Sequence, residues 1–247
     1  MSDPAYAYDE DVNWGVLRLW GSRAESDVLD VGCGFATTSA EIEKRGSRVT
    51  GIEMNGAAVA KASSRLSGVL QADLNDIGSV TERLGGAMFD VVMFADVLEH
   101  LTDPLAIVRG YLRFLRPGGT VIVSLPNVAL WSVRVMLLTG RFDYADSGVL
   151  DRTHLRFFTR RTAKELLTAA GLEIVKTTYN PGLVRPFVPL VKSFSRRGSA
   201  VEHDPAALMQ SPAYRAYLRL IYPIERAVTM LAPGLLAFQT VMEATRK

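Results

Sequence analysis

The sequence predicts an α/β protein built on a doubly wound sheet with an inserted helical cap or lid. Short apolar runs alternate with helical patterns between residues 27 and 125, and this alternation requires parallel strands joined by right-handed crossovers. The first apolar run ends in the glycine turn Gly32-Cys33-Gly34. Such a turn lets the backbone approach a ligand closely and directs the amides of the next helix at it.

The first half of the chain alternates regularly. The expected elements are, in order, a lead-in helix over 11–24, a strand ending at Val31, a helix over 36–45, a strand over 48–53, a helix over 56–66, a strand over 69–73 and a helix near Ile77. In the second half, Phe89 begins a fourth strand, and Asp103-Pro104 begins a helix with an N-cap acid and a proline in its first turn. That helix is expected to stop at Arg116-Pro-Gly-Gly119.

The remaining strands close the sheet. They are expected over 119–125, 172–178 and 235–244. A further helix is expected between the end of the lid and the sixth strand. Thr159 or Thr162 caps this helix, with Glu165 in the capping-box position relative to Thr162.

The glycine turn alone does not separate two kinds of nucleotide ligand. A dinucleotide fingerprint needs a third glycine, but Thr37 stands where it would be. Asp30 lies in the strand beside the glycines, where it would repel a pyrophosphate and attract a cationic amino group. Both details disfavour a nucleotide-binding oxidoreductase or epimerase.

The motif Asp30-Val-Gly32-Cys-Gly34-Phe-Ala36 resembles the first motif of class I S-adenosylmethionine-dependent methyltransferases, in which a glycine is usual where Ala36 stands. Asp96-Val-Leu-Glu-His100-Leu also resembles that family. The resemblance implies a Rossmann-like, seven-stranded sheet whose last strand is antiparallel, with S-adenosyl-L-methionine as the methyl donor.

Three carboxylates are expected to contact that donor. Asp30 attracts its amino group, Glu53 lies 21 residues after Gly32 at the offset of a ribose-binding acid, and Asp73 with Leu74 holds the adenine by resemblance. A solvated strand-end acid at Glu53 and a turn-capping acid at Asp73 are the structural alternatives. The predicted donor site also includes the residues that border these motifs: Gly32, Cys33, Gly34, Met54 and Phe94. Cys33 is expected to be a small packed side chain and not a nucleophile.

Residues 127–159 form the predicted substrate lid, because a long connection at the carboxyl end of a strand usually binds substrate. The lid mixes aromatic residues with arginines, which suit sugar rings and anions respectively. The stretch from Gly140 to Phe158 resembles bacterial methyltransferases found with glycosyltransferases in polysaccharide biosynthesis. That resemblance implies a sugar, glycan or lipid-linked saccharide as the acceptor.

His154 is the predicted general base, since imidazole can take a hydroxyl proton near neutral pH, and Asp151 is predicted to orient it. A structural histidine bonded to a loop carbonyl is the alternative. His100 and Asp96 are further candidates for the base. A divalent cation is not expected, although Asp96, Glu99 and His154 could converge around one.

The chain is predicted to form one domain, with a cofactor core over 24–126 and 160–180, the lid over 127–159 and a helical cap over 181–233. A formal net charge of +2 gives no reason to expect nucleic-acid binding, and the single cysteine fits a reducing compartment. No signal peptide or membrane-spanning run is evident, so a cytoplasmic protein is expected. Basic residues between Arg185 and Arg197 suggest peripheral contact with the inner membrane face or a lipid phosphate, with a pocket-covering helix as the alternative.

The leading hypothesis is therefore an O-methyltransferase acting on a sugar or glycan hydroxyl. The alternatives are a methyltransferase for a small non-sugar molecule and a non-catalytic cofactor-binding partner of a glycosyltransferase.

Overall fold

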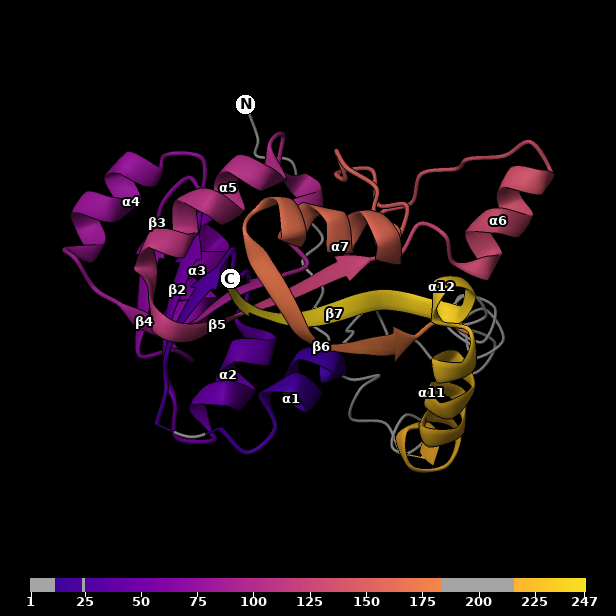
Figure 1. Ribbon diagram of the computed structural model, residues 1–247, viewed down its shortest axis with the longest axis horizontal. Coiled ribbons are helices and arrows are strands. Elements are labelled where there is room, and N and C mark those ends of the chain that lie inside the picture. The colour runs from indigo at the N-terminus through magenta and orange to yellow at the C-terminus, as the bar shows by residue number, and fades with distance from the viewer. Residues whose placement is uncertain (1–11, 24, 184–215) are drawn as a thin grey trace, which may run out of the picture.

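The computed structural model describes residues 12–23, 25–183 and 216–247. Its seven strands form one sheet in the order β3-β2-β1-β4-β5-β7-β6, and only β7 runs antiparallel to its neighbours (Figure 1). The strands are β1 (Asp27–Val31), β2 (Arg48–Glu53), β3 (Gly68–Gln71), β4 (Phe89–Ala95), β5 (Leu115–Pro126), β6 (Leu172–Pro181) and β7 (Ala237–Arg246). The predicted fold class and the antiparallel last strand are confirmed.

Helices cover both faces of the sheet (Figure 1). One face packs against α1 (Trp14–Trp20), α2 (Thr37–Glu43) and α3 (Gly56–Ser63). The other packs against α4 (Ile77–Leu84), α5 (Pro104–Tyr111) and α7 (Arg160–Ala169). The short turns η1 (Leu98–His100) and η2 (Leu112–Phe114) flank α5. Towards one end of the molecule lie α6 (Trp131–Leu138), η4 (Tyr217–Ile221), α11 (Tyr222–Leu231) and α12 (Pro233–Leu236).

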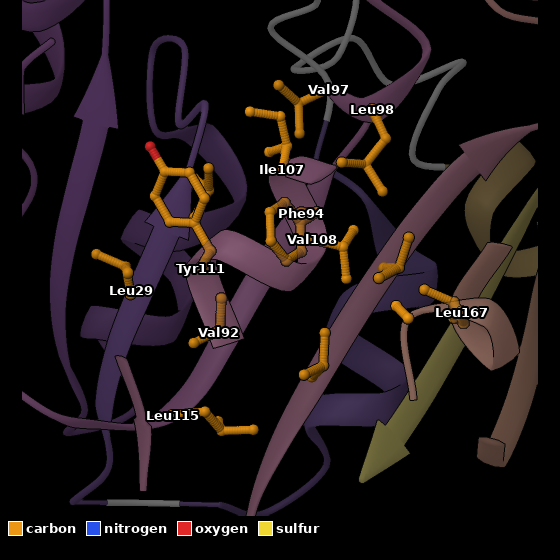
Figure 2. Close-up of a cluster of buried hydrophobic side chains, with 14 of the residues drawn as sticks. Leu29, Val92, Phe94, Val97, Leu98, Ile107, Val108, Tyr111, Leu115 and Leu167 are labelled. Carbon is orange, nitrogen blue, oxygen red and sulfur yellow. The ribbon is translucent and has the colours of Figure 1, made fainter. Parts of the chain in front are cut away.

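Alternation along the strands decides which side chains enter each core. Figure 2 shows Leu29, Val92 and Phe94 pointing into the cluster that α5 covers with Val108 and Tyr111. Residues of the opposite parity, such as Val28 and Met93, face α1, α2 and α3. Asp30 shares the parity of Val28, and it accordingly meets Ser39 of α2.

Three predicted boundaries differ from the structure. The Pro-Gly-Gly stretch belongs to β5, because Leu115 pairs with Phe89 before a register shift restores regular pairing with β4. The closing strand begins at Ala237, since Pro233 starts the short helix α12 before it. The lid, expected to be irregular, contains α6, whose Val133 packs into a small cluster with Leu130 and Phe238.

The capping of α7 also differs in detail. Thr159 is the N-cap, and its hydroxyl accepts a hydrogen bond from the amide of Thr162 at 3.2 Å. The side chain of Thr162 completes the capping box, while Glu165 pairs instead with Arg161 at 2.9 Å. A threonine at the third helical position thus replaces the acid that the motif predicted.

Candidate active site

The glycine turn after β1 adopts backbone conformations that favour glycine. Gly32 and Gly34 have φ angles of 78° and 52°, and a Cβ atom on Gly32 would lie 2.4 Å from Cγ2 of Val97. The turn is therefore packed tightly against the segment that follows β4. Ala36, which stands at the family's usual glycine, is also left-handed with φ 57° and directly precedes α2.

Asp30 is buried, and one of its carboxylate oxygens accepts a hydrogen bond from the hydroxyl of Ser39. The other oxygen, Oδ1, has no hydrogen-bond partner among the described residues. Burial raises the pKa of Asp30 to about 7, with the nearby Glu53 carboxylate adding to the effect and Ser39 opposing it. A cationic group near Oδ1 would stabilise the ionised form.

Glu53, at the end of β2, binds the backbone of the glycine turn. Its Oε2 accepts from the Gly34 amide at 3.0 Å, and its Oε1 accepts from the amides of Met54 and Asn55, each at 2.8 Å. These bonds fix the carboxylate at the carboxyl edge of the sheet beside β1. A carboxylate has capacity for a further donor, as a ribose hydroxyl would require.

The other predicted donor contacts divide into accessible and buried ones. Met54, beside Glu53, is 56% exposed. Asp73 accepts a hydrogen bond from the amide of Asn75 at its Oδ1, at 2.9 Å, and this is the turn-capping role considered as the alternative to adenine binding. Phe94 is fully buried against Tyr111, because strand parity turns its side chain into the core, so a contact of Phe94 with the cofactor would use its backbone. Leu74 lies at the edge of the same core.

Cys33 packs against the small-residue position at Gly51, and burial raises the pKa of its thiol. A high pKa suppresses the thiolate, which agrees with the predicted packing role.

Asp96 belongs to a buried polar network at the ends of β4 and β5. Its Oδ1 accepts from the Ser124 hydroxyl and its Oδ2 from the side-chain amide of Asn13, both at 2.8 Å. Asn13 also caps α1 and accepts a hydrogen bond from Asn180 of β6 at 2.8 Å. With both oxygens bonded in this network, Asp96 positions the lead-in helix over the sheet edge.

His154 lies in the lid with its ring almost fully buried. Its Nδ1 lies 3.1 Å from the carbonyl oxygen of Val149, and its Nε2 lies 4.0 Å from Oε1 of Glu99. A carbonyl can only accept, so the proton resides on Nδ1 and the lone pair on Nε2. Burial lowers the pKa of His154, so the ring is neutral.

Asp151 does not orient His154, contrary to the prediction. Its Oδ1 accepts from the hydroxyl of Thr153 at 2.7 Å, and that hydroxyl oxygen lies 3.1 Å from Nδ1 of His100. Because the Thr153 proton is directed at Asp151, the hydroxyl accepts from His100 and fixes a proton on its Nδ1. Asp151 therefore orients the other histidine, whose ring centroid is 4.7 Å from that of His154.

Glu99 was named in the sequence only as a convergence point for a cation and not as a site residue. It is 1% exposed, and its Oε2 has no hydrogen-bond partner in the described part of the chain. Burial, with Asp96 as the next cause, raises its pKa well above the usual value. Its backbone carbonyl accepts from the amides of Leu155 and Arg156 at 2.9 and 3.0 Å, which attaches the lid to η1. The spacing between Glu99 and His154 gave no signal of this contact.

The aromatic side chains of the lid pack together, whereas its arginines each pair with a different group. Phe142, Tyr144 and Phe157 pack edge to face or tilted, with ring centroids 5.5 to 6.3 Å apart, and Phe157 contacts His154. The six arginines between 134 and 161 each have a partner within the chain, either an acid, a backbone carbonyl or, for Arg160, the Tyr179 hydroxyl. Arg141, Arg152 and Arg161 are largely exposed and keep further N–H donors, so anion binding by these arginines stays a prediction.

The sequence matches a family model described as "Methyltransferase domain" over residues 7–177. The chain belongs to this family. It is an S-adenosylmethionine-dependent methyltransferase, in agreement with the glycine turn and the carboxylates at the sheet edge. Asp30, with its unpartnered buried oxygen, and Glu53 are suited to hold the amino and ribose groups of that donor.

Known proteins agree with this membership. The chain is 33% identical over 182 residues to the ubiquinone biosynthesis O-methyltransferase of Pseudomonas aeruginosa (strain UCBPP-PA14), covering 69% of this chain and 75% of that protein. A methyltransferase structure from Archaeoglobus fulgidus superposes with a TM-score of 0.60 at 17% identity, covering 97% and 95% of the two chains. Magnesium protoporphyrin IX methyltransferase from Synechocystis with bound S-adenosylhomocysteine superposes with a TM-score of 0.53 at 15% identity, covering 95% and 79%. Polysaccharide-associated methyltransferases are not among these relatives.

The expected membrane contact falls on residues that the structure leaves undescribed. Arg185 to Arg197 lie outside the described ranges, as does most of the first part of the predicted cap. Within the described ranges, no helix has the length and hydrophobicity needed to span a bilayer.

Proposed function

We propose that this methyltransferase transfers its methyl group to a hydroxyl oxygen placed beside Glu99 and His154. The observation that carries the proposal is the buried His154 ring, whose proton is held on Nδ1 by Val149 and whose Nε2 faces Glu99. Glu99 lies in η1, directly after the carboxyl end of β4, and the lid holds His154 beside it, at the sheet edge where ligands of parallel α/β folds bind.

S-adenosylmethionine supplies an electrophilic methyl group carried on a sulfonium. The chain orients this donor with Asp30 and Glu53 and brings the acceptor hydroxyl to the Glu99–His154 pair. A hydroxyl oxygen becomes a stronger nucleophile as its proton leaves, and neutral Nε2 of His154 can receive that proton. The rings of Phe142, Tyr144 and Phe157 offer a surface on which a ring-bearing acceptor can stack.

Two acceptor classes follow from different observations. The aromatic surface and the resemblance of residues 140–158 favour a sugar or glycan hydroxyl. The relatives named for ubiquinone biosynthesis favour a hydroxyl on an aromatic ring instead. The following test separates the two acceptor classes.

The test uses donor labelled in its methyl group, incubated with the full chain and two acceptor panels. One panel contains sugar nucleotides, glycolipids and oligosaccharides, and the other contains mono- and dihydroxylated aromatic compounds with and without an isoprenoid tail. Label recovered as a methyl ether in either panel supports the proposal and selects the class. Label recovered on nitrogen, carbon or sulfur would overturn it.

A further inference from the structure

Asn13, the residue that caps α1, contacts both halves of the site. Its backbone amide bonds to the hydroxyl of Thr38 at 2.9 Å, in α2, the helix that also binds the carboxylate of Asp30. Its side-chain amide bonds to Asp96 at 2.8 Å, at the start of the turn that leads to Glu99. We infer that Asn13 is a positioning residue that aligns the methyl donor with the acceptor hydroxyl. The inference rests on the proposed function for the place of the acceptor beside Glu99.

Asp96 has a backbone conformation that its neighbours must hold in place. Its φ is 57°, in the left-handed region that a side chain disfavours, although aspartate and asparagine adopt it more readily than most residues. Its amide donates to the Ser124 carbonyl at 3.1 Å, and its carboxylate accepts from the Ser124 hydroxyl and the Asn13 amide. These bonds fix the direction in which the chain leaves β4.

The turn after β4 passes this constraint on to the proposed base. The carbonyl of Glu99 accepts from the amides of Leu155 and Arg156 at 2.9 and 3.0 Å, so the place of η1 decides the place of the lid. His154 directly precedes Leu155, and its Nε2 lies 4.0 Å from Oε1 of Glu99. A shift at Asp96 would therefore move Nε2 relative to the methyl group.

Asn13 is itself held by the far side of the sheet. Its Oδ1 accepts from the side-chain amide of Asn180 in β6 at 2.8 Å and from the Val16 amide at 3.2 Å. Gly15 permits this close approach, since a Cβ atom there would lie 2.5 Å from a side-chain carbon of β7. An asparagine suits the position because it both donates and accepts, whereas an aspartate would have no donor for Asp96.

Alignment differs from stability in what it changes. A displacement of about 1 Å can lower turnover by about 100-fold even when the altered residue lies away from the reacting atoms. Affinity for the methyl donor depends on Asp30 and Glu53, whose side chains Asn13 does not contact. A change at Asn13 should accordingly lower turnover while it leaves donor affinity in place.

Asn13→Asp tests the bond to Asp96 by itself. The new carboxylate can still cap α1 and accept from Asn180, but it has no donor for Asp96 and repels it. Turnover, measured with labelled donor and the panel compound that accepts label, should fall by about 100-fold. Affinity for S-adenosylhomocysteine, measured by calorimetry, should stay within about threefold. The reverse exchange at the N-cap of α4, Asp76→Asn, is the matched control and should leave both quantities unchanged.

The double variant Asn13→Asp with Asp96→Asn should recover turnover to within about tenfold of the wild type, because the two substitutions exchange donor and acceptor. Ser124 can still donate to position 96, and the introduced amide tolerates the left-handed conformation. That amide cannot take a proton, so recovery would separate positioning from general-base catalysis by Asp96. Wild-type turnover in Asn13→Asp, or a double variant no faster than the slower single one, would overturn the inference.

Hydrogen exchange tests the same connection without an acceptor. Relative to the amides of β1, those of Leu155 and Arg156 should exchange about tenfold faster in Asn13→Asp than in Asp76→Asn, and should return to the wild-type rate in the double variant. Unchanged exchange would overturn the inference. If no panel compound accepts label, the proposed function fails, and the exchange rates still decide the role of Asn13. Normal turnover in His154→Ala would likewise reject the proposed base without removing the effect of Asn13→Asp.

Discussion

Nε2 of His154 lies 4.0 Å from Oε1 of Glu99, although the two residues belong to different segments, the lid and the turn after β4. The contact forms because the amides of Leu155 and Arg156 bond to the Glu99 carbonyl. One backbone oxygen thus fixes the distance between the two side chains on which the proposed acceptor site depends.

Replacing His154 with alanine should lower turnover by about 100-fold or more while leaving the affinity for S-adenosylhomocysteine unchanged. The loss is expected because Nε2 of the imidazole receives the proton of the acceptor hydroxyl. Single-turnover rates and calorimetry measure the two quantities. Val175→Ala, at an exposed position on β6, is the control. Turnover within about threefold of the wild type in His154→Ala would remove His154 from the mechanism.

Cofactor binding should depend on pH through Asp30. Its pKa is raised to about 7, and only the ionised carboxylate attracts the donor's amino group. The affinity for S-adenosylhomocysteine should therefore rise by up to about tenfold per pH unit below pH 7 and level off above it. Asp30→Asn should bind more weakly and lose this slope. A wild-type profile that is flat between about pH 5 and pH 7 would contradict the assignment.

The same carboxyl group should affect the stability of the unliganded protein in the opposite direction. The folded-state pKa lies above the unfolded value of about 3.9, so the folded protein binds the proton more tightly. Its contribution to the free energy of unfolding is complete below the unfolded pKa of about 3.9 and falls as the pH rises towards the folded pKa of about 7. Above about pH 7 the contribution no longer changes with pH. Denaturant unfolding of wild type and Asp30→Asn across this range measures the difference.

Glu53→Ala should weaken S-adenosylhomocysteine binding by about 10- to 100-fold, the loss expected for hydrogen bonds to a charged group. The substitution removes the acceptor of the Gly34, Met54 and Asn55 amides, so it loosens the turn as well as the ribose contact. Glu82→Ala, on the exposed side of α4, supplies the comparison. Equal affinities for the two variants would place the ribose elsewhere.

Asn13→Ala should destabilise the fold by about 2–4 kcal/mol, because it removes one hydrogen bond each from Asp96, Ser124 and Asn180 as well as a helix cap. Asn55→Ala removes a cap from α3 that has no such network, and it should cost only about 1 kcal/mol. Denaturant midpoints give both values. Similar costs for the two substitutions would show that the network contributes little.

Gly32→Ala should lower the free energy of unfolding by about 2–4 kcal/mol for two reasons. The new Cβ atom would clash with Val97, and alanine would have to adopt a left-handed backbone conformation. Gly85 has a similar φ of 59° with open space around it, so Gly85→Ala isolates the conformational part at about 1 kcal/mol. Comparing the two unfolding free energies separates the steric clash from backbone strain. No difference between them would mean that the turn can move away from Val97.

The donor half could be predicted from sequence because its signals are local. The glycine turn, the acid at the end of β2 and the N-cap at Asp103 each depend on neighbours a few residues away. The side chain of Phe94 shows the limit of such signals: strand parity, and not proximity to the sheet edge, decides whether a side chain faces the core.

The acceptor half depends on contacts between distant segments, which no local pattern encodes. The pairing of Glu99 with His154 requires the lid to fold back onto η1, and the orientation of His100 by Asp151 passes through the hydroxyl of Thr153. The sequence drew attention to His154, His100 and Asp151, which the fold brings together, but it joined Asp151 to the wrong ring. Residue type indicated the chemistry, and only the fold determined the partners.

The position of β7 between β5 and β6 sets an order of assembly. The five strands from β3 to β5 pair with one another using residues up to Pro126, so they can associate early during synthesis. Strand β6 is made next but pairs within the sheet only with β7, whose residues 237–246 leave the ribosome much later. Until then β5 presents an open edge, and Asn180 lacks its bond to Gln239. The nascent chain is therefore most vulnerable to aggregation after the methyl-donor edge has formed and before its last strand is inserted.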